Sequence, residues 1–180
     1  LSPQENGDFI AQLAQFSTVE GIETLNGSME SLVNGYQSSQ ALQASALVGR
    51  TVIVPADKAM VDTAKGIKGQ LALPSASNNV YVNVTDASGS VVTRLNLGSQ
   101  PSGMHDFVWD GKNSGGNLMP PGRYQFEAQA AIGGENKQLA TLLPANVDSV
   151  SLGNGKGGGM MLNVAGLGSI SLSNIVSIGQ

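Results

Sequence analysis

Four oxygen-bearing side chains crowd one polar loop of the sequence, between two strand-like segments: Asp110, Asn113, Ser114 and Asn117. Carboxylate, amide and hydroxyl oxygens are the ligands that calcium takes in proteins. Counted from Asp110 as the first position of a calcium loop, Gly115 is the required glycine, but Lys112 and Pro121 replace an acidic or amide ligand and the closing glutamate. The same residue types favour Asx turns and left-handed backbone. We therefore predict a long hairpin loop that binds no metal.

Few other residues could support catalysis. The chain has no cysteine and one histidine, His105, so a cysteine nucleophile is excluded and a zinc site would need carboxylates for nearly all its ligands. Asp106 and Asp110 flank a strand-like run at a spacing that can place both side chains on one strand face. A hydrolase built on this pair is one alternative. Because nothing else converges on them, we favour solvated surface carboxylates and predict no catalytic residue and no cofactor.

Residues 153–158 match the GxGxxG pattern of a dinucleotide-binding loop by letter. That fold needs a helix directly after the loop, because the helix N-terminus holds the pyrophosphate. Residues 160–164 instead alternate like a strand, and Gly157 stands where the Walker pattern needs Ser or Thr after Lys156. We predict that this stretch is a flexible hairpin tip.

Residues 69–136 are expected to form a β-sandwich of the fibronectin-III or immunoglobulin-like kind. Alternating apolar runs recur about every ten positions with turn residues between them; they cover 70–73, 80–84, 91–97, 107–109 and 124–130. Five of the eight aromatic residues fall within 81–126, which indicates one compact core there. The predicted members of the sandwich core are Tyr81, Trp109, Tyr124 and Phe126.

The remaining β segments are predicted to form a second, small barrel. Residues 48–54 are β-branched and stop at Pro55, and short apolar runs recur from 139 to 178 between glycine-rich turns. The C-terminal piece is small to fold alone, and both regions lack aromatic residues. The expected barrel is therefore discontinuous, with residues 48–68 and 137–180 interrupted by the inserted sandwich at 69–136.

Residues 1–47 are predicted to form an N-terminal assembly helix. The segment Ser2-Pro3-Gln4-Glu5 has the form of a capping box with proline at the first helical position. Apolar side chains then recur mostly at steps of three and four, as in a heptad seam; they are Phe9, Leu13, Phe16, Ile22, Leu25, Met29, Leu32 and Tyr36. This stripe needs a partner, either this chain's own β domains or another copy. We expect these eight residues to form the assembly interface.

Composition limits the classes of partner. The chain is 41% hydrophobic and 12% charged, with a net charge of -4 and nine scattered basic residues. The absence of a basic cluster argues against a nucleic-acid partner. No run of about 18 apolar residues exists, so no membrane insertion is predicted. The chain begins at Leu1 without a visible cleavable signal, and we expect it to be a fragment of a longer protein.

Three segments, in order along the chain, resemble the flagellar hook-capping family, also described as basal-body rod modification or hook assembly scaffolding proteins. They are the helical signature Phe9–Ser17 with Val19 and Glu20, the hairpin Trp109–Asn113 with Gly116-Asn117 and Pro120–Tyr124, and the closing segment Gly166–Ile175. The resemblance implies a tudor-like barrel interrupted by a fibronectin-III-like sandwich. It also implies an export and assembly region before the helix, most of which we expect to be missing.

The resemblance implies a non-enzymatic scaffold. It would self-associate into a cap oligomer at the distal end of the growing hook, outside the cell, and promote polymerisation of the hook subunits exported beneath it. The main alternative is an extracellular β-sandwich module that binds a glycan or an adhesion partner. Such a module would need exposed aromatic residues, and the candidates Tyr81, Trp109 and Tyr124 are better explained as core positions.

Overall fold

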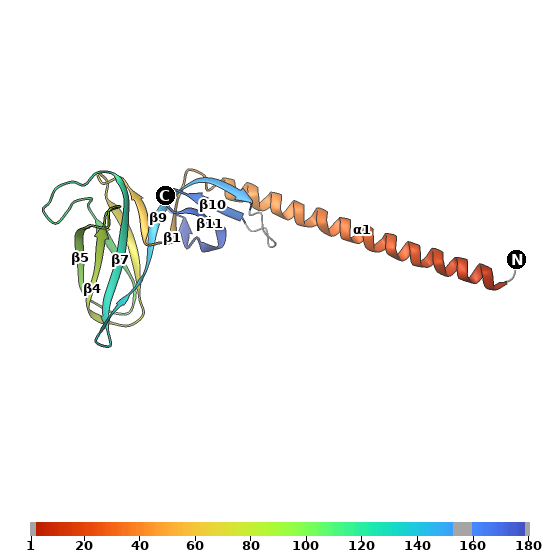
Figure 1. Cartoon of the computed structure of the whole chain (residues 1–180), viewed down its shortest axis with the longest axis horizontal. Helices are drawn as coiled ribbons and strands as arrows, with labels where there is room; N and C mark the ends of the chain where they lie inside the picture. Colours follow the sequence, from red (N-terminus) through yellow and green to blue (C-terminus); the bar gives the residue numbers. More distant parts are fainter. Residues whose placement is uncertain (1–2, 153–159, 179–180) are drawn as a thin grey trace. The chain divides into compact units, whose positions relative to one another are not determined.

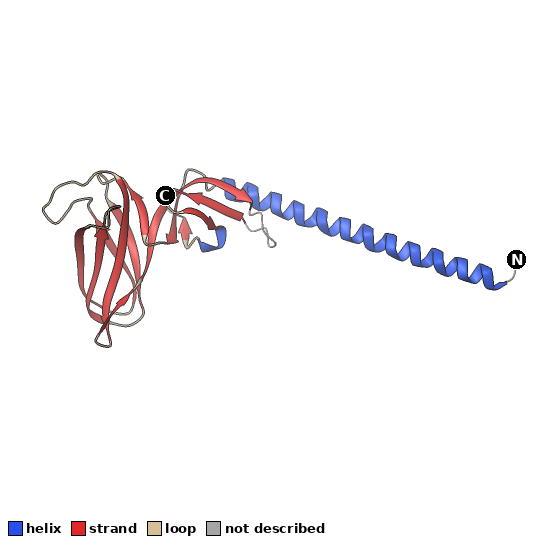
Figure 2. Cartoon of the chain, viewed as in Figure 1, coloured by secondary structure: helices blue, strands red, loops and turns tan. Residues whose placement is uncertain are grey.

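The computed structural model describes residues 3–152 and 160–178, and within them the chain is mainly β with one N-terminal α-helix (Figure 1, Figure 2). The helix is α1 (Pro3–Ser45). The strands are β1 (Thr51–Pro55), β2 (Lys58–Val61), β3 (Ile67–Leu73), β4 (Ser77–Thr85), β5 (Val91–Gln100), β6 (Gly103–Trp109), β7 (Gly122–Ile132), β8 (Glu135–Gln138), β9 (Ala140–Leu152), β10 (Met160–Val164), β11 (Gly168–Ser171) and β12 (Ser177–Ile178), with a 3-10 turn η1 (Leu172–Asn174). The chain forms two compact units, residues 1–43 and 44–180.

Helix α1 is long and largely polar apart from its apolar stripe. Its hydroxyl side chains bond back to the preceding turn: Thr18 Oγ1 donates to the carbonyl of Ala14 and Thr24 Oγ1 to that of Glu20, each at 2.8 Å. Serine and threonine are therefore accommodated inside the helix at little cost. The helix ends at Ser45 rather than at the predicted residue 47, because the chain turns there and passes through Gly49 at φ +79°.

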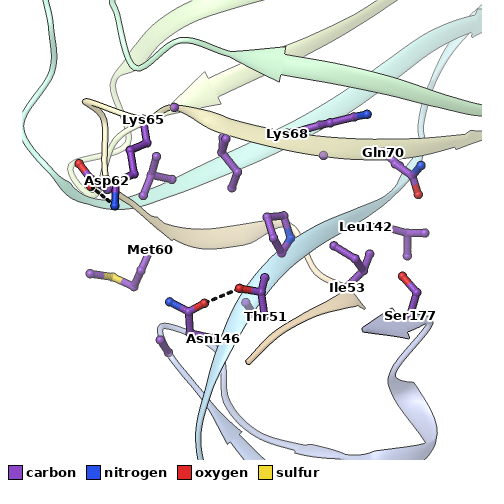
Figure 3. A pocket seen from close by; sticks show the side chains of 17 residues that line it. Thr51, Ile53, Met60, Asp62, Lys65, Lys68, Gln70, Leu142, Asn146 and Ser177 are labelled. Atoms are coloured by element: carbon purple, nitrogen blue, oxygen red, sulfur yellow. Dashed lines mark hydrogen bonds and ion pairs between the residues drawn. The ribbon is translucent and has the colours of Figure 1, made fainter. Parts of the chain in front are cut away.

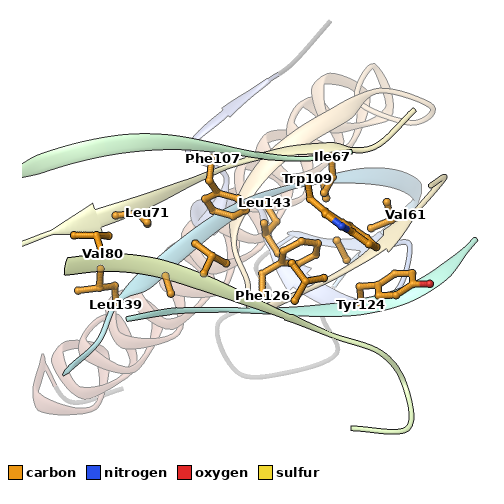
Figure 4. Packing of buried hydrophobic residues seen from close by; sticks show 14 of the residues in the cluster. Val61, Ile67, Leu71, Val80, Phe107, Trp109, Tyr124, Phe126, Leu139 and Leu143 are labelled. Carbon is orange, nitrogen blue, oxygen red and sulfur yellow. The ribbon is translucent and has the colours of Figure 1, made fainter. Parts of the chain in front are cut away.

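The larger core lies between two layers of strands (Figure 4). In the described part of the chain, one layer is a five-stranded antiparallel sheet in the order β2-β7-β4-β5. Its fifth strand, β8, pairs with the same edge of β7 as β2, farther along the strand. The other layer is β3 paired with β6 and with the start of β9. Alternate residues of β3 and β7 point inward, as the pleat requires; Val80, Val82 and Val84 of β4 are fully buried. This cluster also contains Phe107, Trp109, Tyr124 and Phe126.

The smaller core belongs to the strands β1, β9, β10 and β11, with β12 on the outer edge of β1. Val52 and Val54 of β1 and Leu162 of β10 are buried at its centre. Like the predicted barrel, this cluster contains no aromatic residue.

Strand β9 runs continuously through both cores, where the sequence predicted two separate runs. Its residue Leu143 packs in the larger cluster, and Val147 packs in the smaller one. Pro144, between them, is tolerated because of the hydrogen-bond pattern. The N–H of Val147 donates to the carbonyl of Arg50 at 3.0 Å, so the backbone N–H and C=O groups of the odd-numbered residues of this part of β9 point toward β1. The backbone of Pro144 therefore points toward the opposite edge of β9. On that edge β3 pairing stops at Leu142 and β10 pairing begins at Val147, so no ladder bond is lost.

The predicted boundary of the inserted sandwich differs from the strand pairing. Residues 58–68 were assigned to the barrel, but β2 pairs with β7 over Lys58–Val61. Ala59, Val61 and Ile67 are buried in the larger cluster. The sandwich strands therefore begin at residue 58, eleven residues before the predicted start at 69.

Candidate functional site

The eight predicted interface residues all lie on α1 with their side chains exposed to solvent. Exposed fractions range from 51% at Leu13 to 73% at Phe16, whereas the core residues Leu71 and Phe126 are 0% exposed. Large apolar side chains gathered on one exposed element indicate a surface that another molecule covers. This is the feature of the chain that an assembly role would use.

The eight residues form two groups on different sides of the helix. Phe9, Leu13 and Phe16, here named the N-terminal patch, are spaced by four and three residues. The second group, here named the long seam, is spaced by three, four, three and four residues and comprises Ile22, Leu25, Met29, Leu32 and Tyr36. At about 100° per residue, the centres of the two groups lie about 170° apart around the helix axis. The two groups therefore form two surfaces on opposite sides of the helix.

Further apolar residues of α1 are exposed but were not predicted as interface. Ile10, Val19 and Val33 are each exposed by 50% or more. They fall outside the two heptad-spaced lines, so a search by steps of three and four passes over them. A count of all large apolar residues on the helix would have found them.

The loop at 110–122 is a turn structure held by its own side chains. Asp110 Oδ1 accepts a hydrogen bond from the backbone N–H of Lys112 at 3.1 Å, and Asn113 Oδ1 accepts from Gly115 and Asn117, each at 3.0 Å. These are the Asx-turn bonds expected from the residue types. Ser114 is held differently, with its N–H donating to the carbonyl of Val92 on β5 at 3.1 Å.

Three of the four predicted core aromatics meet in the larger cluster (Figure 4). The ring of Trp109 packs edge-on against Tyr124 at 4.6 Å between centroids and against Phe126 at 5.9 Å. The indole Nε1 donates to the carbonyl of Lys112 at 2.8 Å, which ties the strand end to the loop. Tyr124 donates its hydroxyl to the carbonyl of Pro120 at 2.6 Å. Burial raises the pKa of Tyr124, which keeps this donor protonated.

The fourth predicted core residue, Tyr81, is buried but lies outside the larger cluster. Its neighbours Val80 and Val82 point into the cluster, so Tyr81 lies on the opposite face of β4. It is nevertheless buried, because the guanidinium of Arg94 lies 4.4 Å from its ring centroid and its hydroxyl donates to Gln129 at 2.7 Å. The ring face is thus covered by a cation and is not open for stacking on a sugar.

The carboxylates considered for catalysis are engaged elsewhere. Asp106 pairs with Lys68 at 2.7 Å and accepts from Gln70 at 2.8 Å, both across the β3–β6 ladder. The hydrogen bond from Lys68 is the main cause that lowers the pKa of Asp106. Asp110 belongs to the turn described above. His105 contacts the carbonyl of Pro101 through Nε2 at 2.7 Å. Among the described residues, no three His, Cys, Asp or Glu side chains gather as a metal site would require.

An open groove of about 630 Å³ is lined by residues of β1, β2, β3 and β9 (Figure 3). Gly69 of β3 and Pro144 and Ala145 of β9 are among them. Lys65 and Lys68 also line it, but they pair with Asp62 at 3.4 Å and with Asp106 at 2.7 Å. The groove offers no convergent catalytic set.

The glycine-rich stretch 153–158 lies outside the described residues. The strand β10 begins directly after it, at Met160, and pairs antiparallel with β9. A dinucleotide site needs a helix at that position.

No helix in the described ranges is long and apolar enough to cross a membrane.

Known proteins similar to this chain share one description. The family model of the FlgD Ig-like domain matches residues 57–134, and that of the N-terminal region of the flagellar hook-capping protein matches residues 1–31. The basal-body rod modification protein FlgD of Escherichia coli (strain K12) is 33% identical over 98% of this chain and 78% of its own length. Its counterpart in Salmonella typhimurium is 32% identical over the same shares.

Two solved structures are similar as well. The crystal structure of FlgD from P. aeruginosa is 58% identical with a TM-score of 0.69, over 74% of this chain and 98% of that one. FlgD from Xanthomonas campestris, described as essential for flagellar assembly through hook capping, is 36% identical with a TM-score of 0.64, over 78% and 99%. The matches to both the helix and the sandwich, and to curated relatives over nearly the whole chain, show that this chain belongs to the FlgD family of flagellar hook-capping proteins.

Proposed function

We propose that this chain is a hook cap, a non-enzymatic scaffold at the distal end of the growing flagellar hook. It holds the tip closed while hook subunits polymerise beneath it. The single observation that carries the proposal, beside family membership, is the exposed apolar surface of α1. A scaffold needs such a surface, and an enzyme would need convergent polar groups instead.

Self-association through the long seam is part of this proposal. Its residues repeat over two heptads and carry no charge, so two copies could pack them together without burying an ion. The second partner of the cap, besides its own copies, is the hook subunit. The opposite sides of α1 allow one helix to contact a neighbouring copy and another molecule at once.

We also propose that the β unit is a discontinuous tudor-like barrel with the sandwich inserted into it. The two clusters of buried residues support this division. The proposed sandwich comprises residues 57–139, because β2 pairs with β7. The barrel then consists of residues 44–56 and 140–178.

Complementation in a bacterium whose hook-cap gene is deleted tests the function. The matching full-length protein should restore hooks visible by electron microscopy, and labelled protein should be found at the tips of growing hooks. If hooks form but the label binds along their sides or at the cell body, the distal location is wrong. If no hooks form while the protein is exported and folded, the capping proposal fails.

A further inference from the structure

The N-terminal patch of α1 continues in register onto carboxylates. Steps of four and three residues lead from Phe9 through Leu13 and Phe16 to Glu20 and Glu23, and the same steps reach Glu30 by way of Gly27. Residues at these steps lie along one line of a helix. Both Glu20 and Glu23 are exposed, like the three apolar residues before them. One side of α1 therefore presents apolar side chains first and acidic ones next.

The opposite side of the helix has the reverse order. The line of the long seam, followed backward by the same steps, reaches Thr18 and Gln15, which are uncharged and polar. The seam itself contains no acidic residue. The two sides thus differ in charge and in the part of the helix that is apolar. One kind of partner therefore does not fit both sides.

A second α1 cannot complement the acidic line. All nine Lys and Arg residues of the chain follow residue 49, and the first is Arg50. Two parallel α1 helices that met along this line would bring Glu20 and Glu23 of each close to the carboxylates of the other, which is destabilising. In an antiparallel pair the same carboxylates would face Phe9 and Leu13, so neither arrangement supplies a cation. The occupant must therefore bring its own cations.

We propose that the line Phe9-Leu13-Phe16-Glu20-Glu23 binds an amphipathic helix of a different protein, which carries apolar residues and then Lys or Arg at heptad spacing. From Phe9 to Glu23 the line is about 21 Å long, at 1.5 Å per residue. Apolar packing over the first part supplies affinity, and opposite charges over the second fix register and partner choice. The inference deepens the proposed scaffold role, because it names the chemistry of the molecule bound opposite the seam.

Binding of designed peptides to the full chain tests the proposal. The probe is a labelled amphipathic peptide that matches the line in length, with Leu at the core positions of one heptad and Lys at those of the next. It is prepared in both orders, and its counterpart has Glu in place of Lys. We expect one Lys peptide to bind, with an affinity that falls as salt rises, and the Glu peptides to bind at least about tenfold more weakly. Equal binding of Lys and Glu peptides would overturn the proposal.

Matched variants locate the site. Glu20→Gln with Glu23→Gln should weaken the Lys peptide about tenfold. Gln15→Lys with Thr18→Lys changes the net charge by the same amount on the opposite side and should have a clearly smaller effect. Equal effects of the two pairs would mean that only net charge matters, and the line would not be a site.

Self-association must be separable from this surface. Phe9→Ser with Phe16→Ser should abolish peptide binding and leave self-association, measured by sedimentation, unchanged. If it abolishes self-association instead, a second copy occupies the line and the proposal is wrong. If the unmodified chain does not self-associate in the same sedimentation assay, the proposed cap oligomer is wrong. The peptide-binding result does not depend on that outcome.

Discussion

At the level of single residues, Trp109 connects the sandwich core to the polar loop. It is 1% exposed, contacts two aromatic rings and donates its indole N–H to the loop carbonyl of Lys112. Trp109→Ala should therefore lower the free energy of unfolding by about 3–5 kcal/mol. Chemical denaturation followed by circular dichroism measures this. Val108→Ala, at an exposed neighbouring position, should change it by less than about 0.5 kcal/mol.

The same loop gives a test of its structural role. Added calcium should leave the melting temperature unchanged, because Asp110 and Asn113 already use their side-chain oxygens as acceptors for backbone N–H groups. A calcium-dependent rise of the melting temperature would mean that those oxygens are metal ligands. Magnesium at the same ionic strength is the control for screening.

Gly111 is a second residue that the loop requires. It has φ +80°, and a Cβ there would collide with the backbone carbonyl of Thr63. Gly89 has a similar φ of +87°, but nothing lies near its Cβ position. Gly89→Ala should cost about 1–2 kcal/mol of unfolding free energy for the left-handed backbone alone, and Gly111→Ala clearly more. Equal losses in thermal denaturation would show that the loop moves away from Thr63 without cost.

At the level of elements, α1 separates assembly from folding. Leu25→Asp with Leu32→Asp should abolish self-association and hook capping and leave the melting of the β unit nearly unchanged, since both side chains are exposed. Burial of Leu-sized side chains is worth about 1.5–3 kcal/mol each before entropy is subtracted. Ser31→Asp with Asn34→Asp adds the same charge on another side of the helix and should preserve association. If the seam variant melts the β unit, the seam belongs to the intramolecular core.

The strands show which elements periodicity reveals and which it does not. Most sandwich strands were predictable because their apolar residues alternate between turn signals, as in β3 and β7. Strand β2 falls within residues 48–68, which were predicted as part of the barrel, yet it pairs with β7. Its four residues indicate that one face is buried, but they do not indicate which partner covers that face. Strand β9 reads in the sequence as two short apolar runs, 139–143 and 147–152, because the apolar pattern is interrupted from Pro144 to Asn146. Only the pairing pattern shows that the missing N–H of Pro144 faces an edge without a partner.

The candidate site was predictable in part: its apolar residues were identified, and their arrangement around the helix was not. Heptad spacing identified the apolar residues of α1. That the N-terminal patch and the long seam lie on opposite sides follows from the step of six residues between Phe16 and Ile22 on a continuous helix, which a search by steps of three and four does not reveal. Tyr81 was predicted as a core residue because an aromatic residue in a strand favours burial. It is buried, but on the face of β4 opposite the larger cluster. The ring of Tyr81 is covered by the guanidinium of Arg94, which lies on the next strand, β5. No local pattern in the sequence indicates this contact.

At the level of the whole β unit, the two cores should unfold together. Residues 44–180 form one compact unit, and β9 supplies Leu143 to the larger cluster and Val147 to the smaller one. Leu162 is fully buried in the smaller cluster, so Leu162→Ala should cost about 2–5 kcal/mol of unfolding free energy. Trp109 is the only tryptophan and lies in the larger cluster. Its fluorescence therefore reports on the core that the substitution does not touch.

The expected result is that tryptophan fluorescence and far-ultraviolet circular dichroism give one denaturation midpoint in the variant, lower than in the parent chain. Coincident transitions by two probes indicate a single cooperative unit. Met104→Ala, at a half-exposed position of β6, is a control that should leave both midpoints nearly unchanged. If the dichroism midpoint falls while the fluorescence midpoint stays in place, the smaller core unfolds by itself. Strand β9 would then connect two independent domains and would not transmit stability between them.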